Sequence, residues 1–143
     1  MKLLTRDEYH KQKGKIVFGK DDCPFCNAES QKGHTIWRGK VWYIIHNLSP
    51  YSGNEKHIMA VPYSHKIYFT ELSDEEILEL IEVGNFVKKF FNGENYFSCI
   101  RETMANRSVE HLHIHYIPGK LQGKYLRKML ESQGFPIKED LRI

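Results

Sequence analysis

Three histidines alternate with apolar residues in the segment EHLHIHYIPGK (110–120). Residues two apart on a β-strand point to the same side, so we expect His111, His113 and His115 to form a row on one face. Imidazole can ligate a metal, transfer protons or act as a nucleophile near neutral pH. The row therefore has three interpretations: a polar strand face with incidental histidines, a three-histidine metal site, or a centre for nucleophilic catalysis.

Two cysteines form a C-x-x-C pair in DCPFCN (22–27). In a reducing compartment, Cys23 and Cys26 at this spacing indicate a metal site before they indicate a disulfide. Two thiolates supply half of the four ligands of structural zinc, and the alternative is a pair of free thiols in a turn. The third cysteine, Cys99, lies in an apolar run and is expected to fill space in the core.

The composition is that of a globular protein. Of the 143 residues, 41% are hydrophobic and 27% charged, which excludes an intrinsically disordered chain. The net charge of +3 is too small to indicate binding to duplex nucleic acid, although it favours anionic ligands weakly. We find no signal-peptide pattern and no apolar run of membrane-spanning length, so we expect a cytoplasmic protein that does not interact with membranes.

Runs rich in β-branched and aromatic residues predict the strands that must position these histidines. We expect strands at 40–46, 57–62, 96–102 and over the histidine segment itself. Residues 1–30 are expected to form an N-terminal arm, with a short helix or an irregular start, that carries the cysteine pair. Together with the helices below, this order predicts a single α+β domain over 1–143 with a mainly antiparallel sheet.

Apolar periodicity predicts a long helix over 72–93 and a short C-terminal helix over 123–134. Ser73 is expected to cap the long helix, Glu76 to complete a capping box, and Asn92-Gly93 to end it. The residues expected to face the sheet are Ile77, Leu80, Ile81, Gly84, Val87 and Phe91.

The segment SVEHLHIHYIPG resembles the His-φ-His-φ-His-φ-φ signature of the histidine triad (HIT) family, where φ is apolar. The upstream segment HNLSPYSGNEKHIMAVPYSH (46–65) is similar to the family's ribose-binding region, and most closely to the branch that cleaves diadenosine polyphosphates. The resemblance implies a HIT-like fold, with a five-stranded antiparallel sheet, one long and one short helix, and usually a homodimer.

The resemblance also implies catalytic roles. His113 matches the histidine that attacks the α-phosphorus of a nucleotide and forms a covalent nucleotidyl-imidazole. His115 matches a donor to the phosphate oxygens, and His57 matches the upstream histidine that flanks the same phosphate. Ser108 matches a hydroxyl that contacts the phosphate or the leaving group.

Three further residues are candidates for substrate binding. Asn47 matches the residue that holds the ribose hydroxyls, with turn formation by Asn-x-Ser-Pro as the equal alternative. Ile45 is expected to wall the adenine, or else to be plain core. Arg107 replaces an amide that usually precedes the triad, and it either reaches additional phosphates or is a solvated loop side chain. Lys56, where a glycine is common, also adds positive charge near the expected phosphate.

One branch of the family completes the cysteine pair with two histidines. The matching residues here are His65, in the P-x-x-H sequence after the second family strand, and His111, the first histidine of the triad. The resemblance therefore implies a structural zinc held by Cys23, Cys26, His65 and His111, with the chemistry left to His113.

Our hypothesis is a nucleotidyl hydrolase or transferase that acts on adenosine-containing phosphoanhydrides or phosphoramidates. Its substrate would be an adenine nucleotide or a dinucleoside polyphosphate. The alternative is a zinc-stapled protein that binds or senses nucleotides with negligible turnover. A nucleic-acid partner ranks lower because the chain has no strong basic stripe.

Overall fold

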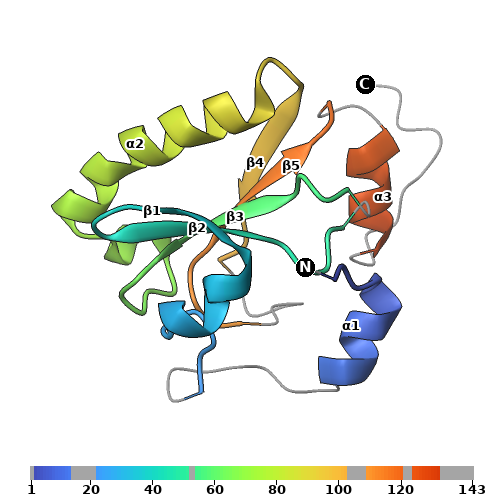
Figure 1. Cartoon of the computed structure of the whole chain (residues 1–143), viewed down its shortest axis with the longest axis horizontal. Helices are drawn as coiled ribbons and strands as arrows, with labels where there is room; N and C mark the ends of the chain where they lie inside the picture. The colour runs from blue at the N-terminus through green and yellow to red at the C-terminus, as the bar shows by residue number, and fades with distance from the viewer. Residues whose placement is uncertain (1, 14–21, 52–53, 103–108, 121–123, 133–143) are drawn as a thin grey trace.

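Five strands form one antiparallel sheet in the order β1-β2-β3-β5-β4 (Figure 1). The computed structural model describes residues 2–13, 22–51, 54–102, 109–120 and 124–132. The strands are β1 (Thr35–Arg38), β2 (Trp42–His46), β3 (Ile58–Pro62), β4 (Tyr96–Ile100) and β5 (Ile114–Pro118). The helices are α1 (Arg6–Lys13), α2 (Asp74–Phe91) and α3 (Lys124–Ser132), with 3-10 turns η1 (Ala28–His34) and η2 (Phe69–Glu71). The α+β class and the antiparallel five-stranded sheet are confirmed.

The chain order places the histidine strand inside the sheet. After β3 the chain runs through α2 to the edge strand β4, and β5 then returns between β3 and β4. His115 is consequently flanked on both sides, by Met59 of β3 and by Cys99 of β4. The backbone of His115 is therefore held by a neighbouring strand on each side.

Helix α2 covers one face of the sheet (Figure 1). Alternate strand residues point toward it, including Ile114 of β5, while Leu112 just before β5 joins the same core. The buried residues of this core are Trp42, Ile44, Ile58, Ala60, Val83, Val87, Phe91, Leu112 and Ile114. The expectation that the residues between the histidines face a core therefore agrees with the structure.

The capping predictions for α2 agree with the structure in detail. The Ser73 hydroxyl accepts the Glu76 N–H at 3.2 Å, and the Glu76 carboxylate accepts the Ser73 N–H at 2.8 Å. Burial opposes ionisation of Glu76, but hydrogen bonds from Ser73 and Ser64 hold its pKa below the usual value. Asn92 ends the helix in the left-handed conformation, with φ of 47°.

The predicted sheet-facing stripe of α2 is wrong in part. Ile77 and Ile81 are 40% and 67% exposed, and Gly84 is exposed as well, whereas Val83 is fully buried. The buried stripe runs through Glu76, Val83, Val87 and Phe91. The carboxylate of Glu76 is buried and hydrogen-bonded to Ser64 and Ser73, while its neighbour Ile77 faces outward.

Strand β1 was not among the predicted strands. Its sequence TIWR is β-branched and aromatic and precedes a glycine, but it is only four residues long. Among the described helices, none is long and apolar enough to cross a membrane.

One carboxylate fastens the β1–β2 hairpin to α2. Glu79 accepts hydrogen bonds from the backbone N–H groups of Lys40, Val41 and Trp42, at 2.5 to 2.8 Å. Gly39 is required beside it, because a Cβ there would lie 2.4 Å from the Trp37 ring and 2.8 Å from the Glu79 carboxylate. The contact fixes the start of β2, whose other face lines the site described below.

We predict that Glu79→Gln lowers the free energy of unfolding by about 1–3 kcal/mol, because an amide presents one acceptor oxygen where three N–H groups converge. Denaturant unfolding measures the change. Glu82→Gln, an exposed carboxylate on the same helix, is the matched control and is expected to change stability by less than about 0.5 kcal/mol. Equal effects of the two substitutions would contradict this account of the hairpin contact.

Candidate functional site

The sheet face opposite α2 carries the cysteine arm and a cavity. Tyr43, Ile45, Met59 and Val61 point to this face and pack against residues of the arm, among them Phe25. The cavity has a volume of about 240 Å³. Both His113 and His115 line it, together with the predicted substrate residues Ile45 and Asn47.

His111 is completely buried and faces the two cysteines. Its Nε2–H donates to the Pro62 carbonyl at 2.7 Å, which leaves the lone pair on Nδ1. That Nδ1 lies 3.3 Å from the Cys23 sulfur and 3.5 Å from the Cys26 sulfur. Burial lowers the pKa of His111 to about 4, so the ring is neutral at physiological pH, as a metal ligand must be.

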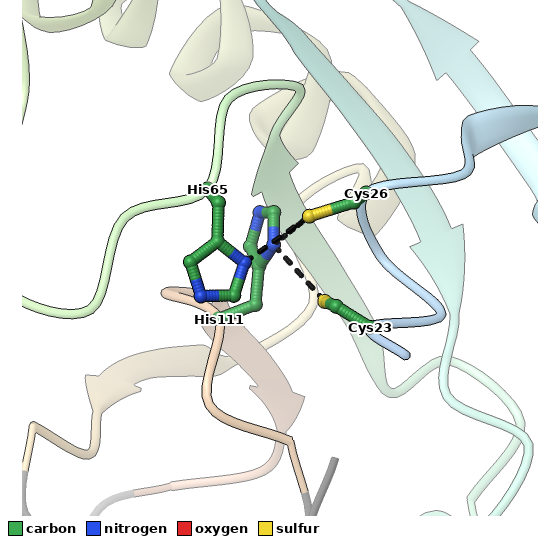
Figure 2. A group of neighbouring side chains, drawn as sticks. All are labelled: Cys23, Cys26, His65 and His111. Carbon is green, nitrogen blue, oxygen red and sulfur yellow. Dashed lines mark hydrogen bonds between the residues drawn. The ribbon is translucent and has the colours of Figure 1, made fainter. Parts of the chain in front are cut away.

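The residues predicted to hold zinc gather in one cluster (Figure 2). His65 Nδ1 lies 3.1 Å from the Cys26 sulfur, and the four ligand atoms of Cys23, Cys26, His65 and His111 all lie within 4.8 Å of one another. Tetrahedral zinc with ordinary bond lengths separates such atoms by about 3.3–3.8 Å. Burial raises the pKa of Cys23 to about 11, so its sulfur keeps a proton at neutral pH unless a cation replaces it. The Cys2His2 cluster therefore fits a zinc site, and neither His113 nor His115 belongs to it.

His113 is half-buried, with its ring on the cavity. Its Nδ1–H donates to the His111 carbonyl at 2.6 Å, so the lone pair of the neutral ring lies on Nε2. The ring packs edge-on against Phe25, with centroids 5.3 Å apart, and lies 4.7 Å from the His115 ring. These contacts fix the orientation of the His113 ring at the cavity.

His115 and His57 form a closed set of hydrogen bonds with Tyr51. The backbone N–H of Tyr51 donates to His57 Nδ1 at 3.3 Å, so His57 carries its proton on Nε2. The His57 Nε2–H donates to His115 Nδ1 at 2.9 Å. His115 Nε2–H then donates to the Tyr51 hydroxyl at 3.2 Å. His57 is not among the described residues that line the cavity. Its connection to the cavity is the hydrogen bond to His115, which does line it.

The predicted substrate-binding residues differ in what surrounds them. Asn47 is buried, and its Oδ1 accepts the Ser49 N–H at 2.9 Å, so the turn contact is formed while the residue also lines the cavity. Ile45 is 1% exposed and belongs to the core of this face as well as to the lining. Ser108 and Arg107 lie outside the described residues. The Lys56 ammonium contacts the Glu94 carboxylate at 2.5 Å instead of lining the cavity.

Two residues at the cavity were not identified from the sequence. Tyr51 is 4% exposed, and Arg101 donates from Nη2 to its hydroxyl at 2.6 Å. Arg101 comes directly after β4, two residues past Cys99. The sequence places Arg101 at the end of β4. It indicates that Arg101 lies near the histidines only when β4 is known to pair with β5.

Comparisons with known proteins agree with this fold. The family described as "Protein similar to CwfJ C-terminal" matches residues 10–131. No curated protein matches the chain by sequence.

Solved structures of HIT proteins superpose on the chain. A zinc-bound HIT family protein from Mycobacterium smegmatis is 18% identical with a TM-score of 0.58, over 81% of this chain and 96% of that one. A histidine triad nucleotide-binding protein from Candida albicans is 22% identical with a TM-score of 0.58, over 68% and 75%. The Plasmodium falciparum diadenosine triphosphate hydrolase, in complex with cyclomarin A, is 25% identical with a TM-score of 0.53, over 71% and 72%. The chain therefore has a HIT-like fold.

We predict that Cys26→Ser abolishes stoichiometric zinc binding, because a hydroxyl is a poor replacement for a thiolate ligand. Elemental analysis of the purified protein should give about one zinc per chain for the wild type and well under half for the variant. Cys99→Ser is the control, since Cys99 lies on β4 outside the cluster. Zinc retained by Cys26→Ser, or lost equally from both variants, would contradict the assignment.

Proposed function

The chain belongs to the family of proteins similar to the CwfJ C-terminal region, and from its HIT-like fold we propose that it is a nucleotidyl hydrolase or transferase. Its proposed substrates are adenosine-containing phosphoanhydrides or phosphoramidates, cleaved through a covalent nucleotidyl-histidine. The observation that carries the proposal is the hydrogen bond from His113 Nδ1–H to the His111 carbonyl. It supports a neutral imidazole with its Nε2 lone pair on the cavity side.

In the proposed reaction, His113 Nε2 attacks the α-phosphorus, and the bond to the leaving group breaks in line with the attack. The electron pair of that bond leaves with the departing group. The imidazole becomes positively charged and keeps its Nδ1–H on the His111 carbonyl, which stabilises that charge. Water or another acceptor then attacks the phosphorus and loses a proton to solvent, and the electron pair of the broken phosphorus–nitrogen bond returns to Nε2. The protein's main contribution is positioning and charge stabilisation.

His115 is proposed to donate its Nε2–H to a phosphate oxygen. In the substrate-free arrangement that proton is directed to the Tyr51 hydroxyl at 3.2 Å, and His57 holds the opposite side of the ring. A phosphate oxygen that replaces the hydroxyl as acceptor meets a donor already oriented, which lowers the entropic cost of binding. Ser108 is proposed to contact the same phosphate or the leaving group, and Arg107 to reach further phosphates.

Zinc held by Cys23, Cys26, His65 and His111 is proposed to be structural. When bound, it would supply a cross-link between the N-terminal arm, the loop after β3 and the segment before β5. That cross-link would hold the backbone of His111, on which the orientation of His113 depends. All four donors are protein atoms, which is typical of a closed, non-catalytic site.

The adenosine part is proposed to lie against Ile45, with its ribose near Asn47, because both residues line the cavity that contains His113. The homodimer, the cytoplasmic location and the single domain over residues 1–143 stay predictions.

We predict that His113→Ala reduces turnover by more than about 10³-fold, because the variant lacks the nucleophile. Phosphorus NMR of diadenosine triphosphate, diadenosine tetraphosphate and adenosine phosphoramidate reports the bond cleaved and the acceptor. Tyr116→Phe, on the same strand but facing the α2 core, is expected to keep wild-type turnover. Equal turnover by His113→Ala and the wild type would remove His113 from its role. AMP binding without turnover of any substrate would favour the nucleotide-sensor alternative.

A further inference from the structure

The cavity carries a permanent positive charge. Arg101 is the only lysine or arginine among the described residues that line it, and that described lining contains no aspartate or glutamate. The other ionisable groups on it include His113 and His115, which are neutral when they act as described above. With one cation and no carboxylate, the walls favour an anionic ligand.

Arg101 and His113 lie at the same end of the β4–β5 ladder. In the β4–β5 ladder, Cys99 pairs with His115 and Ile100 pairs with Ile114. Arg101 comes directly after the last pair of this ladder on one chain segment, and His113 comes directly before it on the other. Both side chains line the cavity.

Tyr51 connects the guanidinium of Arg101 to His115. Arg101 Nη2 donates to the Tyr51 hydroxyl at 2.6 Å, and its guanidinium carbon lies 5.5 Å from the centre of the Tyr51 ring. The same hydroxyl contacts His115 Nε2 at 3.2 Å. The Tyr51 hydroxyl therefore bridges Arg101 and His115, the proposed hydrogen-bond donor to the phosphate. A planar guanidinium can hold phosphate oxygens in a forked geometry, which an ammonium cannot.

We propose that Arg101 binds the phosphate next to the one attacked by His113, so that the site selects substrates whose leaving group is a phosphate chain. This inference rests on the proposed nucleotidyl transfer. When the phosphoanhydride P–O bond breaks, its electron pair goes to the oxygen of the departing phosphate, and the guanidinium neutralises the added charge without transferring a proton. An amine that leaves from a phosphoramidate takes up a proton and departs neutral, so it has no comparable need of Arg101.

Binding measurements test the inference independently of turnover. Calorimetric titration of the full zinc-loaded chain with AMP and with ADP isolates the effect of one additional phosphate. We expect the wild type to bind ADP about 10- to 100-fold more tightly than AMP, the range of a charge-assisted hydrogen bond. Arg101→Gln is expected to bind the two nucleotides within about twofold of each other. Arg38→Gln, on the exposed part of edge strand β1, removes the same charge outside the cavity and is expected to keep the preference for ADP.

A wild type without preference for ADP, or an Arg101→Gln variant that keeps it, would overturn the inference. Should Arg101→Gln fail to fold, judged by its melting curve and zinc content, Arg101→Lys replaces it. We expect the lysine variant to lose at least about threefold of the preference, because it lacks the forked geometry. A full preference in that variant would count against Arg101.

Kinetics separate this inference from the proposed function. Arg101→Gln should lower kcat/KM for diadenosine triphosphate by about 10- to 100-fold, and for adenosine phosphoramidate by less than about threefold. Equal losses on both substrates would make Arg101 a general positioning residue and overturn the selectivity. Absence of turnover by the wild type on either substrate would contradict the proposed function, while the AMP and ADP titrations would still decide whether Arg101 recognises the second phosphate.

Discussion

The position of His111 is the constraint on which the rest of the site depends. This buried residue makes three directed contacts: Nδ1 faces the cysteines, Nε2–H bonds the Pro62 carbonyl, and its own carbonyl accepts the His113 Nδ1–H. Polar groups buried to this degree are costly unless satisfied. A small shift of the backbone at His111 would therefore disturb the metal cluster and the tautomer of His113 together. His111 therefore connects the Cys2His2 cluster to the orientation of the His113 ring.

The three histidines have three different surroundings although their spacing is uniform. Strand β5 begins only at Ile114, so His111 and His113 precede the regular ladder. His111 can consequently turn to the cysteine arm, while His115, fixed between β3 and β4, bonds His57 and Tyr51. His113 lies between them, and its Nδ1–H is held by the His111 carbonyl. The spacing alone did not distinguish the three histidines, whereas the structure gives each ring different partners.

Local signals in the sequence were sufficient for the features that depend on neighbouring residues. The capping of α2 by Ser73 and its end at Asn92 follow from short-range hydrogen bonds, and both agree with the structure. The helix face did not follow from apolar periodicity, because the charged residue Glu76 is buried while the apolar Ile77 is exposed. Strand β1 was missed since four residues carry too little pattern. The gathering of the four zinc-site residues came from resemblance to a family and not from spacing.

Long-range contacts explain what the sequence alone did not reveal. His57 meets His115, 58 residues later, only because β5 inserts beside β3. Arg101 meets Tyr51 for the corresponding reason on the β4 side. No local sequence pattern predicts that order of strands. The contacts of His57 with His115 and of Arg101 with Tyr51 could therefore be identified only from the structure.

The central claim is that His113 Nε2 forms a bond to phosphorus. Rapid mixing of the zinc-loaded protein with diadenosine triphosphate, a quench that preserves the phosphorus–nitrogen bond, and peptide mapping by mass spectrometry test it most directly. The account predicts an adenylyl group on the peptide that contains His113, formed and lost at rates compatible with turnover. Efficient cleavage with no adduct on that peptide, or an adduct on a different residue, would contradict it.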